Sequence, residues 1–230
     1  MNELIASSAY FGVFLSLFCY LIGQKIKSKT GLAIANPLLI AVLLVMLILS
    51  LFDIEYSAYN QSAKLLSALL TPATICLAVP LYEQLALLKK HKKAIFAGIL
   101  SGVLTSLTVV FLLSVFFRLD HSAYVTLLPK SITSAIGMGV SEELGGYVPI
   151  TLSVIIMTGI LGNMTAEAAC RLFRITEPIA RGIAIGTSSH AVGTAKAMEL
   201  GPIEGAMSSL SILIAGLLTV AAAPVFAMFW

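Results

Sequence analysis

Six long stretches that contain no Asp, Glu, Lys or Arg constrain most strongly what this chain can fold into. They run Leu4–Gln24, Thr30–Phe52, Leu65–Tyr82, Ala94–Phe117, Leu144–Ala166 and Gly205–Trp230. At 1.5 Å per residue, each is long enough, or nearly so, to cross about 30 Å of hydrocarbon as an α-helix. Of the 230 residues, 59% are hydrophobic and 11% are charged, which excludes a soluble globular protein. The sequence therefore predicts a single all-α polytopic membrane domain over residues 1–230, with about six transmembrane helices.

The basic residues predict how these helices are oriented. Lys and Arg concentrate in cytoplasmic loops, and most of the 14 here form three clusters. The clusters are Lys25, Lys27, Lys29; Lys89, Lys90, Lys92, Lys93; and Arg171, Arg174, Arg181. If all three face the cytoplasm, both termini lie outside. The third span is interrupted by Pro72 and Pro80, and proline within a helix removes a backbone donor, so we expect a broken helix there.

Two further apolar segments are too short to cross. The span Ala94–Phe117 leaves the cytoplasm and the span from Leu144 returns to it, so the chain between them, about 122–145, cannot cross. Its charge-free part is only Ser131–Ser141, and the later segment Gly182–Ala195 is similarly short. Runs of this length fit re-entrant or broken segments better than spans. We expect two of them, one entering from each side of the membrane.

The two short segments also resemble each other, without gaps, at an offset of 56 residues. Ala135-Ile136-Gly137 aligns with Ala191-Val192-Gly193, and Glu143-Leu144-Gly145 aligns with Glu199-Leu200-Gly201. Because one span separates the two copies, they predict the inverted-repeat plan of many secondary transporters. The expected organisation is an N-terminal helix pair (1–60), a broken helix plus a span (61–120), and two inverted repeat units (121–175 and 176–230).

The tips of these two segments are the expected substrate site. Non-helical backbone at membrane depth survives only when it is buried in protein or lines a wet cavity, and hydroxyls with freed N–H groups suit a small carboxylate. The candidate substrate-binding residues are Lys130, Ser131, Thr133, Ser134, Thr187, Ser189, His190 and Thr194. The alternative for the serines and threonines is close helix packing with hydroxyls bonded back to the helix. For Lys130 the alternative is snorkelling to an interface.

Ionisable residues near these tips are candidates for proton or charge coupling. They are His190, Glu199, Glu204, Arg181 and Lys196. Intramembrane ionisable residues are functional hypotheses by default, and histidine titrates near working pH. The alternatives are equally open: a histidine hydrogen-bonded between helices, solvated glutamates at helix ends, and an arginine that belongs to the cytoplasmic cluster.

The sequence lacks the usual motifs of catalysis and metal binding. It has no HExxH, no GxSxG and no phosphate-binding glycine loop, and its three cysteines lie far apart in apolar runs. We therefore expect no catalytic residues, no metal and no cofactor, and we expect that the protein is not an enzyme. The formal charge of +3 is explained by topology and does not indicate nucleic-acid binding.

Several motifs resemble the LrgB/CidB family. They include Pro129-Lys130-Ser131-Ile132-Thr133, the stretch from Ala180 to Ala195 that contains Gly186-Thr187-Ser188-Ser189-His190, and Glu199-Leu200-Gly201. The resemblance covers nearly the whole chain and implies a multi-pass protein of the bacterial cytoplasmic membrane. Some relatives have proline where this chain has Ala135, which affects only the local kink.

The resemblance implies two different functions. Bacterial members were named antiholin-like proteins, thought to oppose holin-like partners and to restrain murein hydrolases and lysis. The plastid relative, in which LrgA-like and LrgB-like parts are fused, exchanges glycolate and glycerate, and bacterial pairs are linked to pyruvate movement. We expect a transporter or facilitator of small monocarboxylates with an LrgA/CidA-type partner and a homo-oligomeric state. The alternative is an antiholin-like regulator without transport of its own.

Overall fold

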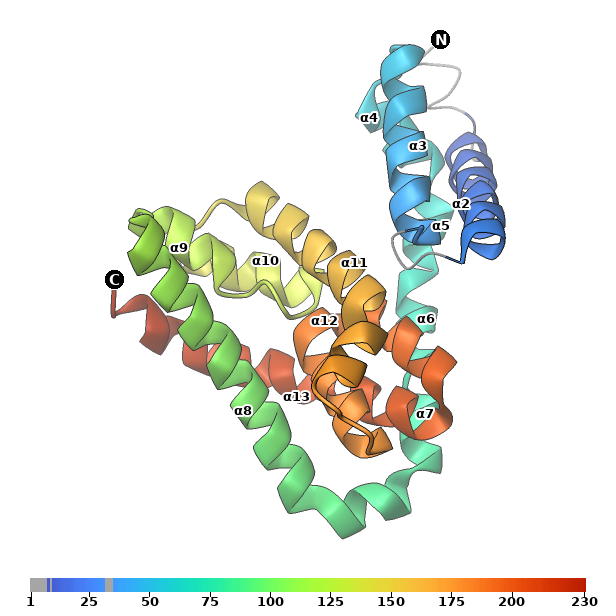
Figure 1. The fold of residues 1–230 in the computed structure, drawn as a ribbon. Helices are drawn as coiled ribbons and strands as arrows, with labels where there is room; N and C mark the ends of the chain where they lie inside the picture. Colours follow the sequence, from blue (N-terminus) through green and yellow to red (C-terminus); the bar gives the residue numbers. More distant parts are fainter. Residues whose placement is uncertain (1–7, 9, 32–34) are drawn as a thin grey trace. The chain divides into compact units, whose positions relative to one another are not determined.

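The computed structural model describes residues 8, 10–31 and 35–230, and every regular element in this part of the chain is an α-helix (Figure 1). The all-α prediction is therefore confirmed for these residues. The beginning of the first predicted span and the start of the second lie outside the described residues. The chain divides into two compact units, Met1–Cys76 and Leu77–Trp230, which are described separately below.

The first unit contains a helix pair followed by short helices. Its helices are α2 (Phe11–Thr30), α3 (Pro37–Leu51), α4 (Tyr56–Ser62), α5 (Lys64–Ala68) and α6 (Leu70–Cys76). The Asn36 side chain accepts hydrogen bonds from the first backbone N–H groups of α3, and Pro37 follows at the first helical position, which is a favourable helix start. Helices α2 and α3 pack through a small apolar cluster that includes Cys19 and Val45.

The predicted break at the two prolines is present. Pro72 lies in α6 and Pro80 lies in α7 (Ala78–Glu83), the first helix of the second unit, and single residues, Leu69 and Leu77, interrupt the helix three positions before each proline. A proline ring clashes with the carbonyl four residues earlier and cannot donate to it. The segment is thus a series of short helices.

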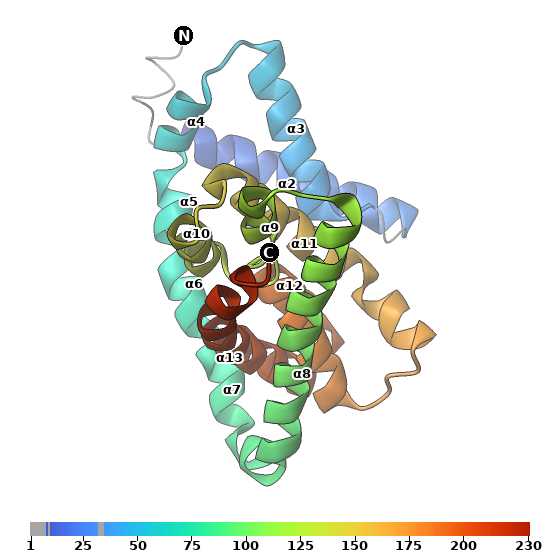
Figure 2. The ribbon, with the colours of Figure 1, turned by 90° about the vertical axis from the view of Figure 1, so that its left-hand side faces the viewer.

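The second unit contains α7 and six further helices. These are α8 (Leu85–Phe117), α9 (His121–Leu127), α10 (Ser134–Glu143), α11 (Val148–Leu172), α12 (Pro178–Leu200) and α13 (Pro202–Ala227). Prolines at the first turns of α11, α12 and α13 fix where these helices begin. Helices α12 and α13 make the most extensive contact, and α8 lies alongside α13 (Figure 2).

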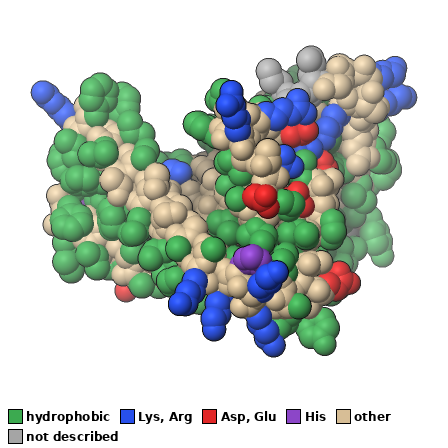
Figure 3. Space-filling model, turned by 60° about the horizontal axis from the view of Figure 1, so that its bottom comes forward, with side chains coloured by type: hydrophobic (Ala, Val, Ile, Leu, Met, Phe, Trp, Pro, Cys, Tyr) green, Lys and Arg blue, Asp and Glu red, His purple; other side chains and the backbone are tan. Residues whose placement is uncertain are grey.

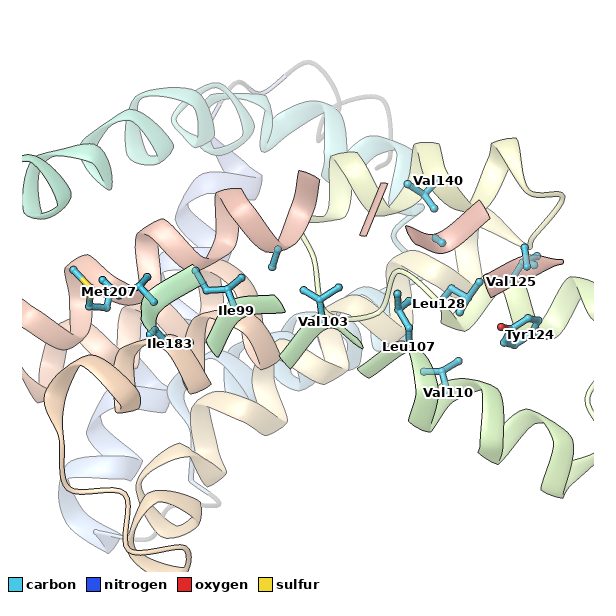
Figure 4. Close-up of a cluster of buried hydrophobic side chains, with 14 of the residues drawn as sticks. Ile99, Val103, Leu107, Val110, Tyr124, Val125, Leu128, Val140, Ile183 and Met207 are labelled. Carbon is cyan, nitrogen blue, oxygen red and sulfur yellow. The ribbon is translucent and has the colours of Figure 1, made fainter. Parts of the chain in front are cut away.

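A stripe of apolar residues on α8 forms the core of this unit. Ile95, Ile99, Val103, Leu107 and Val110 recur at intervals of three or four residues and are buried. Figure 4 shows the stripe meeting Ile183 and Met207 at one end and Tyr124, Val125 and Leu128 at the other. Helix α8 therefore contacts both segments that the sequence predicts to be re-entrant.

Four helical stretches among the described residues are long and apolar enough to cross a membrane. They are Lys64–Glu83, Leu85–Phe117, Val148–Leu172 and Pro202–Ala227. Helix α3 is apolar but shorter, with 15 residues. The exact number of six crossings and their inverted arrangement stay predictions.

Candidate functional site

Helix α12 is a hairpin of two helical arms. Its backbone breaks at His190, where φ is 42° and ψ is −141°, far from helical values. Both arms return to the start of α13. A methyl group on Gly182, in the first arm, would lie 2.5 Å from the carbonyl oxygen of Glu204, and one on Gly205 would lie 2.9 Å from Cγ of Met198, in the second arm. Since Glu204 and Gly205 are neighbours, the two ends of α12 lie at the same level of α13.

Helices α9 and α10 form a second hairpin, with its break over residues 128–133. Both arms are held by the start of α11, where the Thr151 hydroxyl lies 3.0 Å from the carbonyl oxygen of Thr126 in α9 and 2.7 Å from Oγ of Ser141 in α10. The turn after α10 contains Gly145, whose φ of 82° is a value that L-residues rarely adopt. Each of the two short segments from the sequence is therefore a hairpin whose arms pack on the next long helix.

The two hairpins share a packing detail at equivalent positions. A methyl group on Gly137 would lie 3.3 Å from the carbonyl oxygen of Pro129, and one on Gly193 would lie 3.1 Å from Cγ2 of Ile185. Both pairs are related by the offset of 56 that aligns the two segments. In the second hairpin a glycine of the second arm allows the first arm to approach closely, and in the first hairpin the equivalent glycine allows the close approach of the break at Pro129. This supports the internal repeat, although it does not establish its inverted orientation.

A small cavity lies where the two hairpins meet α8 and α13. Its polar lining includes Ser131 from the first hairpin, Thr187 from the second and Ser106 from α8. The free volume of about 10 Å³ is at the lower limit for a single water molecule. Ser131 and Thr187 are aligned residues of the repeat, so the cavity brings together the same position from both copies.

The Ser131 hydroxyl has two hydrogen-bond partners, Lys130 and Ser106. Nζ of Lys130 donates to Oγ of Ser131 at 3.0 Å, and the hydroxyls of Ser106 and Ser131 are 3.2 Å apart. An ammonium can only donate, so Ser131 accepts from it and can donate its own proton. The lysine charge polarises the hydroxyl as a donor toward the cavity.

A groove of about 550 Å³ opens between α8 and α12 and ends at Thr187. Its lining is mainly apolar and small, with polar groups from His91, Ser101, Glu177 and Thr187. At its inner end Gly102 allows α12 to approach, since a methyl group there would lie 3.0 Å from Oγ1 of Thr187. Thr187 also lines the small cavity, so this side chain is common to the groove and the cavity.

His190 and the residues after it are bound by α11. Nε2 of His190 lies 2.9 Å from the carbonyl oxygen of Ile155, and Nδ2 of Asn163 donates to the carbonyl oxygen of Val192 at 2.8 Å. Gly159 and Gly162 provide the space, because side chains there would collide with His190 and Ser189. These contacts hold the break and the start of the second arm against α11.

The other predicted substrate residues lie beside the cavity without lining it. Thr194 hydrogen-bonds the hydroxyl of Ser208 in α13 at 2.7 Å, and Ser189 hydrogen-bonds its neighbour Ser188. Thr133 and Ser134 begin α10, and the Thr133 hydroxyl makes no cap hydrogen bond. Of the predicted substrate residues, Ser131 and Thr187 therefore line the cavity, and Lys130 reaches it only through its hydrogen bond to Ser131. Ser189, His190 and Thr194 instead hydrogen-bond to neighbouring protein groups.

The predicted coupling residues form ion pairs at the ends of α12. Nη1 of Arg181 lies 4.0 Å from the largely buried carboxylate of Glu204. Nζ of Lys196 lies 3.1 Å from Glu199 and 3.6 Å from Glu167 of α11. Both arms of the hairpin are thus tied by charge to the neighbouring helices. Within the described part of the chain, no group of His, Cys, Asp or Glu could hold a metal ion.

The chain was compared with known proteins. The model of the LrgB-like family matches residues 16–229. The chain is 36% identical to antiholin-like protein LrgB of Bacillus subtilis (strain 168), over 95% of each chain. It is 35% identical to the proteins of that name from Bacillus cereus (strain B4264) and Bacillus anthracis (strain CDC 684 / NRRL 3495), over 96% of each chain.

The chain belongs to the LrgB-like family. The predicted family is therefore confirmed, and the relatives together with the apolar helices identify a multi-pass membrane protein. No solved structure matches the chain. The arrangement of the two hairpins therefore rests on the structure of this chain alone.

Sequence reasoning missed several residues of the cavity and groove, among them Ser106, Gly102 and Thr219. Ser106 and Gly102 lie in α8, and Thr219 lies in α13. The available signal was the occurrence of small and polar residues in otherwise apolar spans, such as Ser101-Gly102 and Thr105-Ser106. That signal does not say which face of a helix meets a hairpin, and only the packing of α8 supplies this information.

Proposed function

We propose that this protein is a carrier or facilitator for small monocarboxylates such as pyruvate or glycolate. The observation that carries the proposal is the meeting of Ser131 and Thr187, equivalent residues of two hairpins, at the closed end of a groove. Paired discontinuous helices that place polar groups at one point are the usual architecture of secondary-transporter sites.

The chemistry of this point suits an anion. The Ser131 hydroxyl, which accepts from Lys130, can donate to a carboxylate oxygen, while Lys130 supplies the compensating charge. The Thr187 hydroxyl now donates to the carbonyl oxygen of Ile183 at 2.8 Å, and it would turn toward the substrate when one enters.

In the proposed mechanism, the groove and the cavity are the two halves of one substrate path, and each half is open in a different state of the protein. The groove includes His91 and begins beside Lys89, Lys90, Lys92 and Lys93, so by the distribution of basic residues it opens to the cytoplasm. Beyond Thr187 the cavity is closed in this structure. In the proposed topology of six crossings and two re-entrant hairpins, movement of the hairpins against α8 would close the groove and open the cavity to the outside.

The remaining expectations form part of the same proposal. We propose a location in the bacterial cytoplasmic membrane, an LrgA/CidA-type partner and a homo-oligomeric assembly, without enzymatic activity, metal or cofactor. Arg181, Glu204, Lys196 and Glu199 would couple charge to the movement of the hairpin whose ends they hold. The second candidate function is regulation of murein hydrolases and lysis without transport, which the name of the relatives, antiholin-like protein, supports.

Uptake into liposomes distinguishes the two functions. Labelled pyruvate and glycolate are offered to liposomes that contain the protein with and without an LrgA-type partner. We expect the protein to take up labelled acid, and we expect Thr187→Val to reduce the rate of uptake at least tenfold. The matched control is Ser153→Ala, which removes an exposed hydroxyl of α11 that bonds only the carbonyl oxygen of Pro149. Absence of uptake of either acid in both preparations, with altered lysis in cells that lack the protein, would favour the regulatory function.

A further inference from the structure

A second groove lies between α8 and α13, apart from the one that ends at Thr187. Its volume is about 420 Å³, and its walls are formed by apolar side chains that include Leu88 and Phe96 from α8 and Leu210 and Ile214 from α13. Phe96 is 49% exposed. An apolar groove of this size on the outside of a membrane protein contacts lipid chains.

Two lysines give this groove a charged end. Lys92 and Lys93 line it together with the apolar side chains, and both are exposed. Neither forms an ion pair with any carboxylate in the described residues. Figure 3 shows basic side chains gathered beside a histidine on a surface that is otherwise largely hydrophobic. No described carboxylate therefore pairs with the charge at the groove.

The position of the lysines along α8 matches the level of lipid headgroups. They lie beside the non-helical residue His91 and immediately before the charge-free stretch Ala94–Phe117, so they mark the membrane–water boundary of that helix. The apolar walls continue from them toward the membrane interior. A ligand that fills the groove must therefore carry negative charge at one end and hydrocarbon at the other.

We propose that this groove is a binding site for an anionic phospholipid. Its phosphate lies between the ammonium groups of Lys92 and Lys93, and an acyl chain lies along Phe96, Leu210 and Ile214. Basic pockets between transmembrane helices on the cytoplasmic side bind anionic headgroups in this way. The site is independent of the proposed transport function, since it shares no lining residue with the Thr187 groove.

Fluorescence quenching by brominated lipids tests the proposal. Phe96→Trp is made with Trp230→Phe, which leaves one tryptophan in the groove, and the protein is placed in phosphatidylcholine vesicles. Phosphatidylglycerol or phosphatidylcholine with the same brominated chains is then added. We expect stronger quenching by the phosphatidylglycerol, and a fall of roughly tenfold or more in its apparent affinity in Lys92→Gln/Lys93→Gln. Lys89→Gln/Lys90→Gln removes the same charge outside the groove and should preserve most of the preference.

Each remaining outcome overturns the proposal. Equal quenching by the two lipids would show no headgroup selection, and an equal loss in the two double variants would show only a general surface attraction. Displacement by glycerol phosphate would show a free-phosphate site. If the Phe96→Trp protein does not purify in folded form, thermal stabilisation of the unsubstituted protein by phosphatidylglycerol over phosphatidylcholine, with the same two double variants, decides the question.

Discussion

The contact between Gly162 and Ser189 allows a quantitative test of how α11 holds the break in α12. A methyl group on Gly162 would overlap both Oγ and Cβ of Ser189, which is buried, but would remain 3.5 Å from its Cα. In an open helix, Gly→Ala stabilises by about 0.8–1.0 kcal/mol. Overpacking of this kind costs about 1–3 kcal/mol. We therefore expect Gly162→Ala to lower the free energy of unfolding by up to about 2 kcal/mol.

A second substitution and a control separate this collision from helix propensity. Ser189→Gly removes both colliding atoms, so the double variant should recover stability, with a coupling energy of at least about 1 kcal/mol. Gly139→Ala is the control, because a methyl group there meets nothing within 4 Å. It should stabilise the protein. Reversible unfolding in mixed micelles measures the unsubstituted protein, the two single variants, the double variant and the Gly139→Ala control. If Gly162→Ala stabilised as much as Gly139→Ala, or if Ser189→Gly gave no recovery, the packing argument would be refuted.

Three further predictions concern polar groups near the hairpins. Lys130→Met should abolish uptake in liposomes while the protein stays folded. Lys130→Arg should retain part of the uptake, because the positive charge beside Ser131 is kept. Unchanged uptake in Lys130→Met would remove this residue from the site. Thr187→Val should change the free energy of unfolding by less than about 1.5 kcal/mol, because the hydrogen bonds of the hydroxyl go to carbonyl oxygens of its own helix. A larger loss of stability, measured by unfolding in micelles, would indicate a structural role. Lys196→Met should cost less than about 1 kcal/mol at physiological salt, since the carboxylates of Glu167 and Glu199 are largely exposed; a greater loss would contradict this.

The sequence was sufficient to predict the elements that depend on composition and on local chemistry. Charge-free length predicts the long helices α8, α11 and α13, and the missing donors of Pro72 and Pro80 predict the broken segment. The short charge-free runs predict where α9–α10 and α12 depart from continuous helices. These features follow from the residues themselves or from their near neighbours in sequence, which is why no tertiary information was needed.

The position of the break in α12 could not be predicted in the same way. Neither glycine nor proline stands at position 190, and a positive φ is unusual for histidine. The conformation is supported by residues of α11 that are far away in sequence. The carbonyl oxygen of Ile155 accepts a hydrogen bond from Nε2 of the imidazole, Nδ2 of Asn163 donates to the carbonyl oxygen of Val192, and Gly159 leaves room for the ring. A break that is stabilised from another helix has no local sequence signal.

The distribution of hydrogen bonds predicts which contact would move in the proposed transport cycle. Side-chain hydrogen bonds join α12 to α11 through His190 and Asn163, and to α13 through Thr194. Between the described residues of α8 and α12, by contrast, no hydrogen bond is formed, and they meet at Gly98 and Gly102 through van der Waals contact. Sliding along this contact therefore breaks no directional interaction, whereas separating α12 from α11 breaks at least two. The groove opens at this same contact, so we expect α12 to move together with α11 and α13 relative to α8, with Thr187 passing Gly102.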